Sequence, residues 1–272
     1  MSRLLTAEWK RLWARRMTRF FPAAIVVLLI GGIVIAYFVI ENDEQNVPNF
    51  VADIAGGIEA PDVLGPLSAL LPIMAYVIGA SSIGADSKTG MLEQLLTWEP
   101  RRLRLLAARV IAGGLGVAVI AAVLAALMVA LLYGLAATAG TTNGTSGEFW
   151  TNTAMAVLRT GVASGLFAIF GIAITLLVDS SVGSIVGFLI YSFIIENVIG
   201  AFLPKVAVYT LITNADAFGG GRPVQRVDGS VFSDNFDLID AHSYLTAGLI
   251  LLVAVAVGVM VAGGVFRVRD ID

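Results

Sequence analysis

Long uninterrupted apolar runs are the feature that most constrains what this chain can fold into. A helix needs about 20 apolar residues to cross the roughly 30 Å of hydrocarbon in a bilayer. The runs near or above that length are Phe20–Ile40, Leu64–Gly84, Val110–Ala139, Thr160–Val178, Ser180–Ile195 and Ser243–Phe266. The fifth run is shorter and continues through Glu196 and Asn197 to Leu203. The sequence therefore predicts an all-α integral membrane protein, with residues 1–272 forming one transmembrane domain, a bundle of six spanning helices.

Composition leads to the same class. Of the 272 residues, 58% are hydrophobic and 14% charged, and the mean hydropathy is +0.88. Soluble domains carry about 25% charged residues, so a water-soluble fold has no place for this much apolar surface. The first run is too long for the apolar part of a signal peptide, and Ile40-Glu41-Asn42-Asp43 follows it instead of a small-residue cleavage site. We therefore interpret it as a retained first span.

The segments between the runs alternate in charge. Basic residues gather before the first run, between the second and third runs, and after the last run: Arg3, Lys10, Arg11, Arg15, Arg16 and Arg19; Lys88, Arg101, Arg102, Arg104 and Arg109; Arg267 and Arg269. The segment 41–62 holds six acids and neither lysine nor arginine. Because basic residues are retained on the cytoplasmic side, we expect both termini and the 85–109 loop in the cytoplasm. An even number of spans satisfies this arrangement.

The N-terminal segment 1–19 has the pattern of an amphipathic helix. At 100° per residue, one face carries Leu5, Trp9, Leu12, Trp13, Met17 and Phe20, and the arginines lie away from it. One interpretation is a simple basic anchor before the first span. The other, which the two tryptophans favour, is an elbow helix lying in the membrane interface, with Trp9 and Trp13 at the acyl boundary and Arg15 at the anionic headgroups.

The 85–109 loop contains a short helix of its own in this interpretation. Gly90 ends the second span, and Met91–Trp98 has the length of about two helical turns. Leu92, Leu95 and Leu96 lie on one side of these turns, and Pro100 stops them and starts the next helix. An apolar face in a charged cytoplasmic loop needs a partner protein, or the bundle itself, to cover it.

The order of an acid, Gly90, Glu93-x-Leu95-Leu96, Pro100, an arginine and an alanine-rich membrane helix resembles the ABC-2-type permeases. These are transmembrane subunits of ATP-binding-cassette exporters in the cytoplasmic (inner) membrane. The resemblance implies that the loop is the coupling helix, which contacts an ATPase subunit through Gly90, Leu92, Glu93, Leu95, Leu96 and Pro100. It also implies two ATPase subunits, and a second permease copy or a related permease. Exporters of drugs, lipids, peptides and polysaccharides share this architecture, so the cargo stays open.

The chain itself lacks the residues for ATP hydrolysis. A P-loop requires G-x-x-x-x-G-K-[ST], and at the Lys88-Thr89 pair Ser82 and Ser87 occupy the glycine positions. We therefore expect no enzymatic activity and no cofactor or metal on this chain, with ATP and magnesium bound by the partner subunit. The chain has no cysteine and one histidine, His242. An intramembrane protease or lipid transferase needs a nucleophile beside a base, or a metal-binding carboxylate cluster, so this class of protein is a weak alternative. Nothing in the charge pattern predicts a nucleic-acid partner.

Glu196 and Asn197 interrupt the fifth run and are candidates for function, because charges inside a membrane are costly. The favoured interpretation is a helix break or re-entrant turn with Glu196 facing external water; the alternative is a contact with the transported substrate. A secondary transporter or channel that works without an ATPase is the main rival function, and this pair would be its coupling site. The segment 204–242 is expected to be an external loop. Its first half is expected to lie partly in the membrane, Gly219–Gly221 to form a turn, and the aspartate-rich remainder to be solvated.

Overall fold

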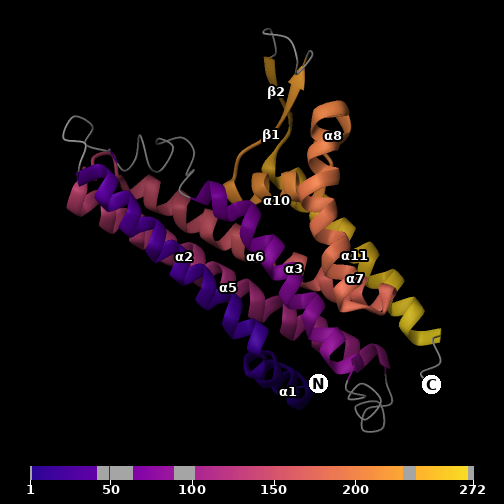
Figure 1. Ribbon diagram of the computed structural model, residues 1–272. Coiled ribbons are helices and arrows are strands. Elements are labelled where there is room, and N and C mark those ends of the chain that lie inside the picture. Colours follow the sequence, from indigo (N-terminus) through magenta and orange to yellow (C-terminus); the bar gives the residue numbers. More distant parts are fainter. Residues whose placement is uncertain (1, 42–48, 50–63, 89–101, 229–236, 269–272) are drawn as a thin grey trace.

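A computed structural model describes residues 2–41, 49, 64–88, 102–228 and 237–268, and these form a bundle of long helices (Figure 1). The helices are α1 (Ser2–Ala14), α2 (Arg16–Glu41), α3 (Gly65–Lys88), α5 (Arg102–Ala139), α6 (Gly147–Val178), α7 (Ser181–Ile190), the π-helical turn η3 (Tyr191–Ile195), α8 (Glu196–Phe202), α9 (Pro204–Ala207), α10 (Leu211–Gly220) and α11 (Tyr244–Val268). The strands β1 (Val224–Asp228) and β2 (Asp237–His242) pair in antiparallel fashion. We call the end of the bundle at which α1 lies the α1 end, and the end from which β1 and β2 project the hairpin end (Figure 1).

Within the described residues, five helical segments are long and apolar enough to cross a membrane. They are Arg16–Phe38, Leu103–Ala139, Gly147–Val178, Ser181–Phe202 and Tyr244–Arg267. In α3 the apolar stretch Ser68–Gly84 is shorter than these, although the whole helix has 24 residues, or about 36 Å at 1.5 Å per residue. The chain is therefore a multi-pass helical membrane protein, as the apolar runs predicted.

The centre of the bundle is the contact of α6 with α3 and α5, and small residues make it possible. A Cβ atom added at Gly79 of α3 would overlap the backbone of Ala168, and one added at Gly171 of α6 would overlap the carbonyl oxygen of Tyr76. On the other side, a Cβ at Gly165 would come within 2.9 Å of the Gly114 carbonyl oxygen in α5. Glycine lets helix backbones approach this closely in membranes, so α6 sits between α3 and α5.

The first span, α2, lies along α5 at one edge of the bundle (Figure 1). Ile25, Val26 and Leu29 pack against the α5–α6 core, whereas Val27, Leu28 and Ile35 are about 70% exposed. This outward face is free to contact lipid or another protein.

The fifth span does not break at Glu196 and Asn197, in contrast to the expectation from sequence. α7 passes through η3 directly into α8, and helical structure ends only at Leu203. The apolar run looked interrupted because a polar pair occurs in it, but the backbone accommodates the pair with a π-helical turn. A single π turn inside an α-helix keeps the backbone hydrogen-bonded.

The segment 204–242 is more ordered than the loop that we expected. α10 packs against α3, α6 and α11; that this half lies partly in the membrane stays a prediction. Gly219 and Gly220 belong to α10 instead of forming a turn, and Gly221 ends the helix with a φ of +70°. The part expected to be a solvated loop contains the β1–β2 hairpin, which projects from the bundle above α10 (Figure 1).

Candidate functional site

The residues predicted to contact an ATPase lie outside the described residues. This holds for Gly90, Leu92, Glu93, Leu95, Leu96 and Pro100. The helices that flank this segment are described: α3 ends at Lys88 and α5 begins at Arg102, both at the α1 end of the bundle. The end of α11 lies here as well, since Gly263 is close to Leu103 and Leu106.

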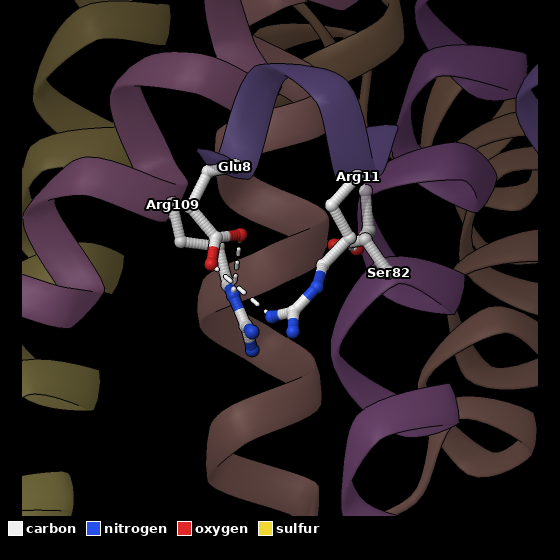
Figure 2. Close-up of polar contacts among 5 residues, drawn as sticks. Glu8, Arg11, Ser82 and Arg109 are labelled. Carbon is white, nitrogen blue, oxygen red and sulfur yellow. Dashed lines mark hydrogen bonds and ion pairs between the residues drawn. The ribbon is translucent and has the colours of Figure 1, made fainter. Parts of the chain in front are cut away.

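An ion pair joins α1 to α5 at this end (Figure 2). The Arg109 Nε lies 3.4 Å from Glu8 Oε2, and Arg11 Nη1 lies 3.2 Å from Glu8 Oε1. Glu8 and Arg109 are 7% and 5% exposed. A buried carboxylate is tolerated only when it is paired and hydrogen-bonded, so the position of α1 depends on Arg109.

The local sequence of α1 explains how it presents this carboxylate. Glu8 and Leu12 are four residues apart and therefore share one face. Leu12 is buried where a Cβ at Gly116 of α5 would overlap its side chain. Trp9 and Trp13 are 37% and 41% exposed, although the Trp9 ring also reaches the same Gly116 position of α5. Within the predicted stripe, Leu12 is therefore buried in the bundle, and the two tryptophans are partly exposed.

A small hollow lies between α1, α3 and α5 beside the ion pair. Arg11, Arg15, Arg109 and Ser82 line it together with Glu8. The Ser82 hydroxyl donates to the Gly79 carbonyl oxygen at 2.7 Å. Arg15, predicted to meet lipid headgroups, is half-buried here at the junction of α1 and α2. Glu8 was not among the predicted site residues, yet it is the only acidic residue before Glu41 in a segment with six basic residues.

A second feature is an apolar groove of about 360 Å³ between α3, α6 and α7–η3. We call it the aromatic groove; its lining is Tyr76, Phe170, Ile174, Val178, Gly183, Ser184, Gly187, Phe188, Tyr191 and Leu211. The rings of Tyr76 and Phe188 stack with centroids 3.7 Å apart. The Tyr76 and Ser184 hydroxyls lie 2.8 Å apart and hydrogen-bond to each other. These lining residues carry no charge, so the groove suits apolar or weakly polar molecules.

Glu196 is buried, at 8% exposed, and does not face water as expected. Its carboxylate accepts hydrogen bonds from the Thr213 and Ile212 N–H groups at 2.7 and 3.2 Å and from the Thr210 hydroxyl at 2.6 Å. Asn197 is exposed, and its amide donates to the Phe193 carbonyl oxygen at 3.1 Å. The interaction partners of Glu196 are therefore residues of α10 and its N-cap.

His242, the single histidine of the chain, is connected to the same region. The Asn214 amide donates to the Val208 and Thr210 carbonyl oxygens at 2.8 and 2.7 Å, which leaves its Oδ1 to face His242 Nε2 at 3.0 Å. Burial lowers the pKa of His242 below its ordinary value of 6.5, so the imidazole is neutral at neutral pH and donates through Nε2.

Charged side chains also meet at the far end of α10. Arg222 Nη2 lies 2.9 Å from Asp216 Oδ2, and the Ser68 hydroxyl of α3 donates to Asp216. Arg159 lies in α6 with its guanidinium carbon 5.2 Å from the ring centre of Tyr244. Among the described residues, no three His, Asp or Glu side chains lie close enough together to hold a metal ion.

The fold is that of a multi-pass helical membrane protein. Buried carboxylates, Glu8 at the α1 end and Glu196 at the hairpin end, connect its helices. A comparison with family models shows which family the chain belongs to. Residues 24–271 match the model of a family described as a protein of unknown function, DUF2705, and the chain belongs to that family. A comparison with curated proteins finds no match.

Proposed function

We propose that the chain is the transmembrane permease subunit of an ATP-binding-cassette exporter of the ABC-2 type. It moves a substrate across the cytoplasmic membrane with ATP hydrolysed by a separate ATPase subunit. In this proposal α2, α3, α5, α6, α7–η3–α8 and α11 are the six spans. The α1 end faces the cytoplasm with both termini, and two ATPase subunits and a second permease complete the transporter.

The observation that carries the proposal is the junction at the α1 end. α3 and α5 flank the predicted coupling segment Gly90–Pro100, and the Glu8–Arg109 pair attaches α1 to α5 seven residues after α5 begins. A displacement of the coupling segment therefore acts on α1, α3 and α5 together. Because α3 and α5 both pack closely on α6, the displacement extends to the centre of the bundle.

The aromatic groove supports a transport route in the same helices. It is bounded by α3 and α6, which would move with the coupling segment, and by α7, which packs against both. Its apolar lining and its Tyr76–Ser184 hydroxyl pair fit a cargo that is mostly apolar. We propose this groove as the cargo contact within one chain.

The arrangement around Glu196 bears on the rival functions. A secondary transporter needs a residue that binds the coupling ion and releases it, and Glu196 was the candidate. Its oxygens are instead occupied by the first turn of α10. An intramembrane enzyme needs a nucleophile beside a base, and His242 is engaged with Asn214 outside the spans. Both observations favour the exporter.

Removal of two leucines from the coupling segment tests the proposal. Each buried leucine contributes roughly 1.5–3 kcal/mol, so Leu95→Ala with Leu96→Ala should remove at least ~3 kcal/mol from the ATPase contact. Since every 1.4 kcal/mol is tenfold, the ATPase should no longer co-purify. The double variant should still insert and elute as the unmodified chain does in detergent.

The matched control is Leu245→Ala with Leu249→Ala, two exposed leucines of α11, which should leave the ATPase bound. Glu93→Lys should have a smaller effect, because a screened ion pair at a rim contributes about 0–1 kcal/mol. Full ATPase binding by the Leu95/Leu96 variant would place the contact elsewhere. If no ATPase co-purifies with the unmodified chain, the hypothesis of a secondary transporter replaces that of an ATP-driven permease.

A further inference from the structure

The first turn of α10 is held by side chains of a different helix. The first N–H groups of any helix have no partner within the helix. In α10, the Leu211 N–H donates to the Tyr191 hydroxyl oxygen at 3.1 Å, Ile212 N–H to Glu196 Oε2 at 3.2 Å, and Thr213 N–H to Glu196 Oε1 at 2.7 Å. Thr210 stands at the N-cap but makes no side-chain cap bond to its own helix. The fifth span thus caps α10 from outside.

The π turn is what allows both side chains to reach α10. Tyr191 and Glu196 are five residues apart, and in a regular α-helix they would point about 140° away from each other. In η3 the Glu196 N–H bonds to the Tyr191 carbonyl oxygen, which makes a wider turn than in an α-helix and brings the two side chains toward the same side. Single π turns in α-helices recur at functional sites.

The charge of Glu196 matches its position. The N-terminus of a helix carries a partial positive charge, which favours a carboxylate there. The Thr210 and Thr213 hydroxyls add hydrogen bonds to Oε1 at 2.6 and 3.1 Å. Without α10 these oxygens would be buried with no such donors, at a large cost. The carboxylate and the helix therefore hold each other in place.

α10 in turn closes one end of the aromatic groove. Leu211, its first residue, lines the groove beside Tyr191. The rest of α10 is wedged between neighbouring helices, since a Cβ at Gly219 would come within 3.0 Å of the Thr160 hydroxyl oxygen and one at Gly248 within 2.7 Å of the Phe218 ring. At its end, Gly221 provides a left-handed residue about which the chain can turn.

We propose that Tyr191, η3 and Glu196 form a clamp that holds α10 across the hairpin end of the aromatic groove, and that release of this clamp lets α10 move and opens the groove at that end. Glu196 is then a positioning residue for a gate, not a contact for cargo. The use of this gate in export rests on the proposed function, whereas the clamp itself is a property of the isolated chain.

Single-cysteine labelling tests the clamp, because the chain has no cysteine of its own. Ala217→Cys reports on α10: Ala217 is 4% exposed and packs against Val208, Val224 and Ala247. Ala108→Cys, at a fully buried position near the α1 end, reports on general loosening of the fold. Each is measured in purified chain in lipid nanodiscs with a membrane-impermeant maleimide.

Glu196→Gln keeps the size of the side chain but replaces one acceptor oxygen by an amide that faces N–H donors. It should raise the labelling rate at Ala217→Cys by about tenfold or more, since hydrogen bonds to a charged group are worth at least that factor. Labelling at Ala108→Cys should not change. Glu196→Asp, which keeps the charge on a shorter side chain, should lie between Gln and the unmodified residue.

Tyr191→Phe provides a second variant that removes the hydroxyl group to which the Leu211 N–H donates and which also interacts with Glu196, and it should raise labelling at Ala217→Cys to a smaller extent than Glu196→Gln. Glu148→Gln, an exposed glutamate in the first turn of α6, is the matched control and should change neither rate. Unchanged labelling at Ala217→Cys in both Glu196→Gln and Tyr191→Phe, or an equal rise at Ala108→Cys, would reject the clamp. Failure of an ATPase to co-purify would reject the proposed function and leave these rates as they are.

Discussion

Buried charged side chains on this chain connect one helix to another, and Glu8 is the clearest example. It is buried between Arg11 and Arg109, close to the start of α5. A lone buried charge is costly, whereas a paired one fixes the geometry of its partners. Glu8 therefore specifies how α1 lies on α5 more than it adds to stability.

Replacing Glu8 tests this account at the level of one residue. Glu8→Gln removes the negative charge beside Arg109 and should lower the free energy of unfolding by about 3–5 kcal/mol, the usual cost of breaking a buried pair. Glu8→Gln combined with Arg109→Gln should recover part of the loss, which a double-mutant cycle in detergent would measure. The exposed Glu148→Gln should change stability by less than about 0.5 kcal/mol. Strict additivity of the two single changes would show that the pair is not coupled.

The sequence predicted that the N-terminal segment is amphipathic, but not what covers its apolar face. Leu12 was placed on one stripe with Trp9 and Trp13, and the structure turns it into the bundle because Gly116 leaves room for it. Glu196 was recognised as unusual from its apolar surroundings alone. Its role as a cap could not be inferred, because that depends on Tyr191, Thr210 and Thr213 meeting in space.

Among the elements, the contact between α3 and α6 is the one that small residues determine most directly. Gly79 and Gly171 lie where the two backbones touch, so neither has space for a side chain. Gly134 in α5, by contrast, has nothing within 4 Å of where its Cβ would be. Glycine is therefore required by packing at Gly79 and Gly171, but not at Gly134.

Alanine substitution at these glycines should have opposite effects. Gly171→Ala places a methyl group against the Tyr76 carbonyl oxygen, which as backbone cannot easily move, and should cost about 1–3 kcal/mol by overpacking. Gly134→Ala should be neutral or stabilise the helix by up to about 1 kcal/mol, from helix propensity. Thermal unfolding of each variant in the same detergent measures the difference. A stabilised Gly171→Ala would contradict the close α3–α6 contact.

Elements were predicted well where they are long and apolar. The six apolar runs lie, to within one residue at their starts, inside α2, α3, α5, α6, α7–η3–α8 and α11. All of these except α3 are long and apolar enough to cross a membrane, because a bilayer imposes length and composition together. The β1–β2 hairpin was missed, since the polar stretches Val224–Asp228 and Asp237–His242 show no clear apolar alternation. The π turn leaves no periodic signal over five residues.

Across the whole molecule, different interactions hold the middle and the ends of the bundle together. Glycine and alanine packing holds the middle of the bundle, and ionic or hydrogen-bonded groups hold the ends: Glu8 with Arg109 at the α1 end, Glu196 with α10 at the hairpin end. In our proposal the first end receives the motion of the ATPase and the second closes the groove. α3 and α6 connect the two.

A photo-crosslinking amino acid at Leu95, in native membranes, tests the central claim most directly. The account predicts a crosslink from this position to a protein that contains a P-loop, identified by mass spectrometry. The same amino acid at Asn143, an exposed residue between α5 and α6, should give no such product. Crosslinks from Leu95 only to this chain or to lipid, or to the same ATPase from both positions, would contradict the assignment of the chain as the permease subunit of an ATP-driven exporter.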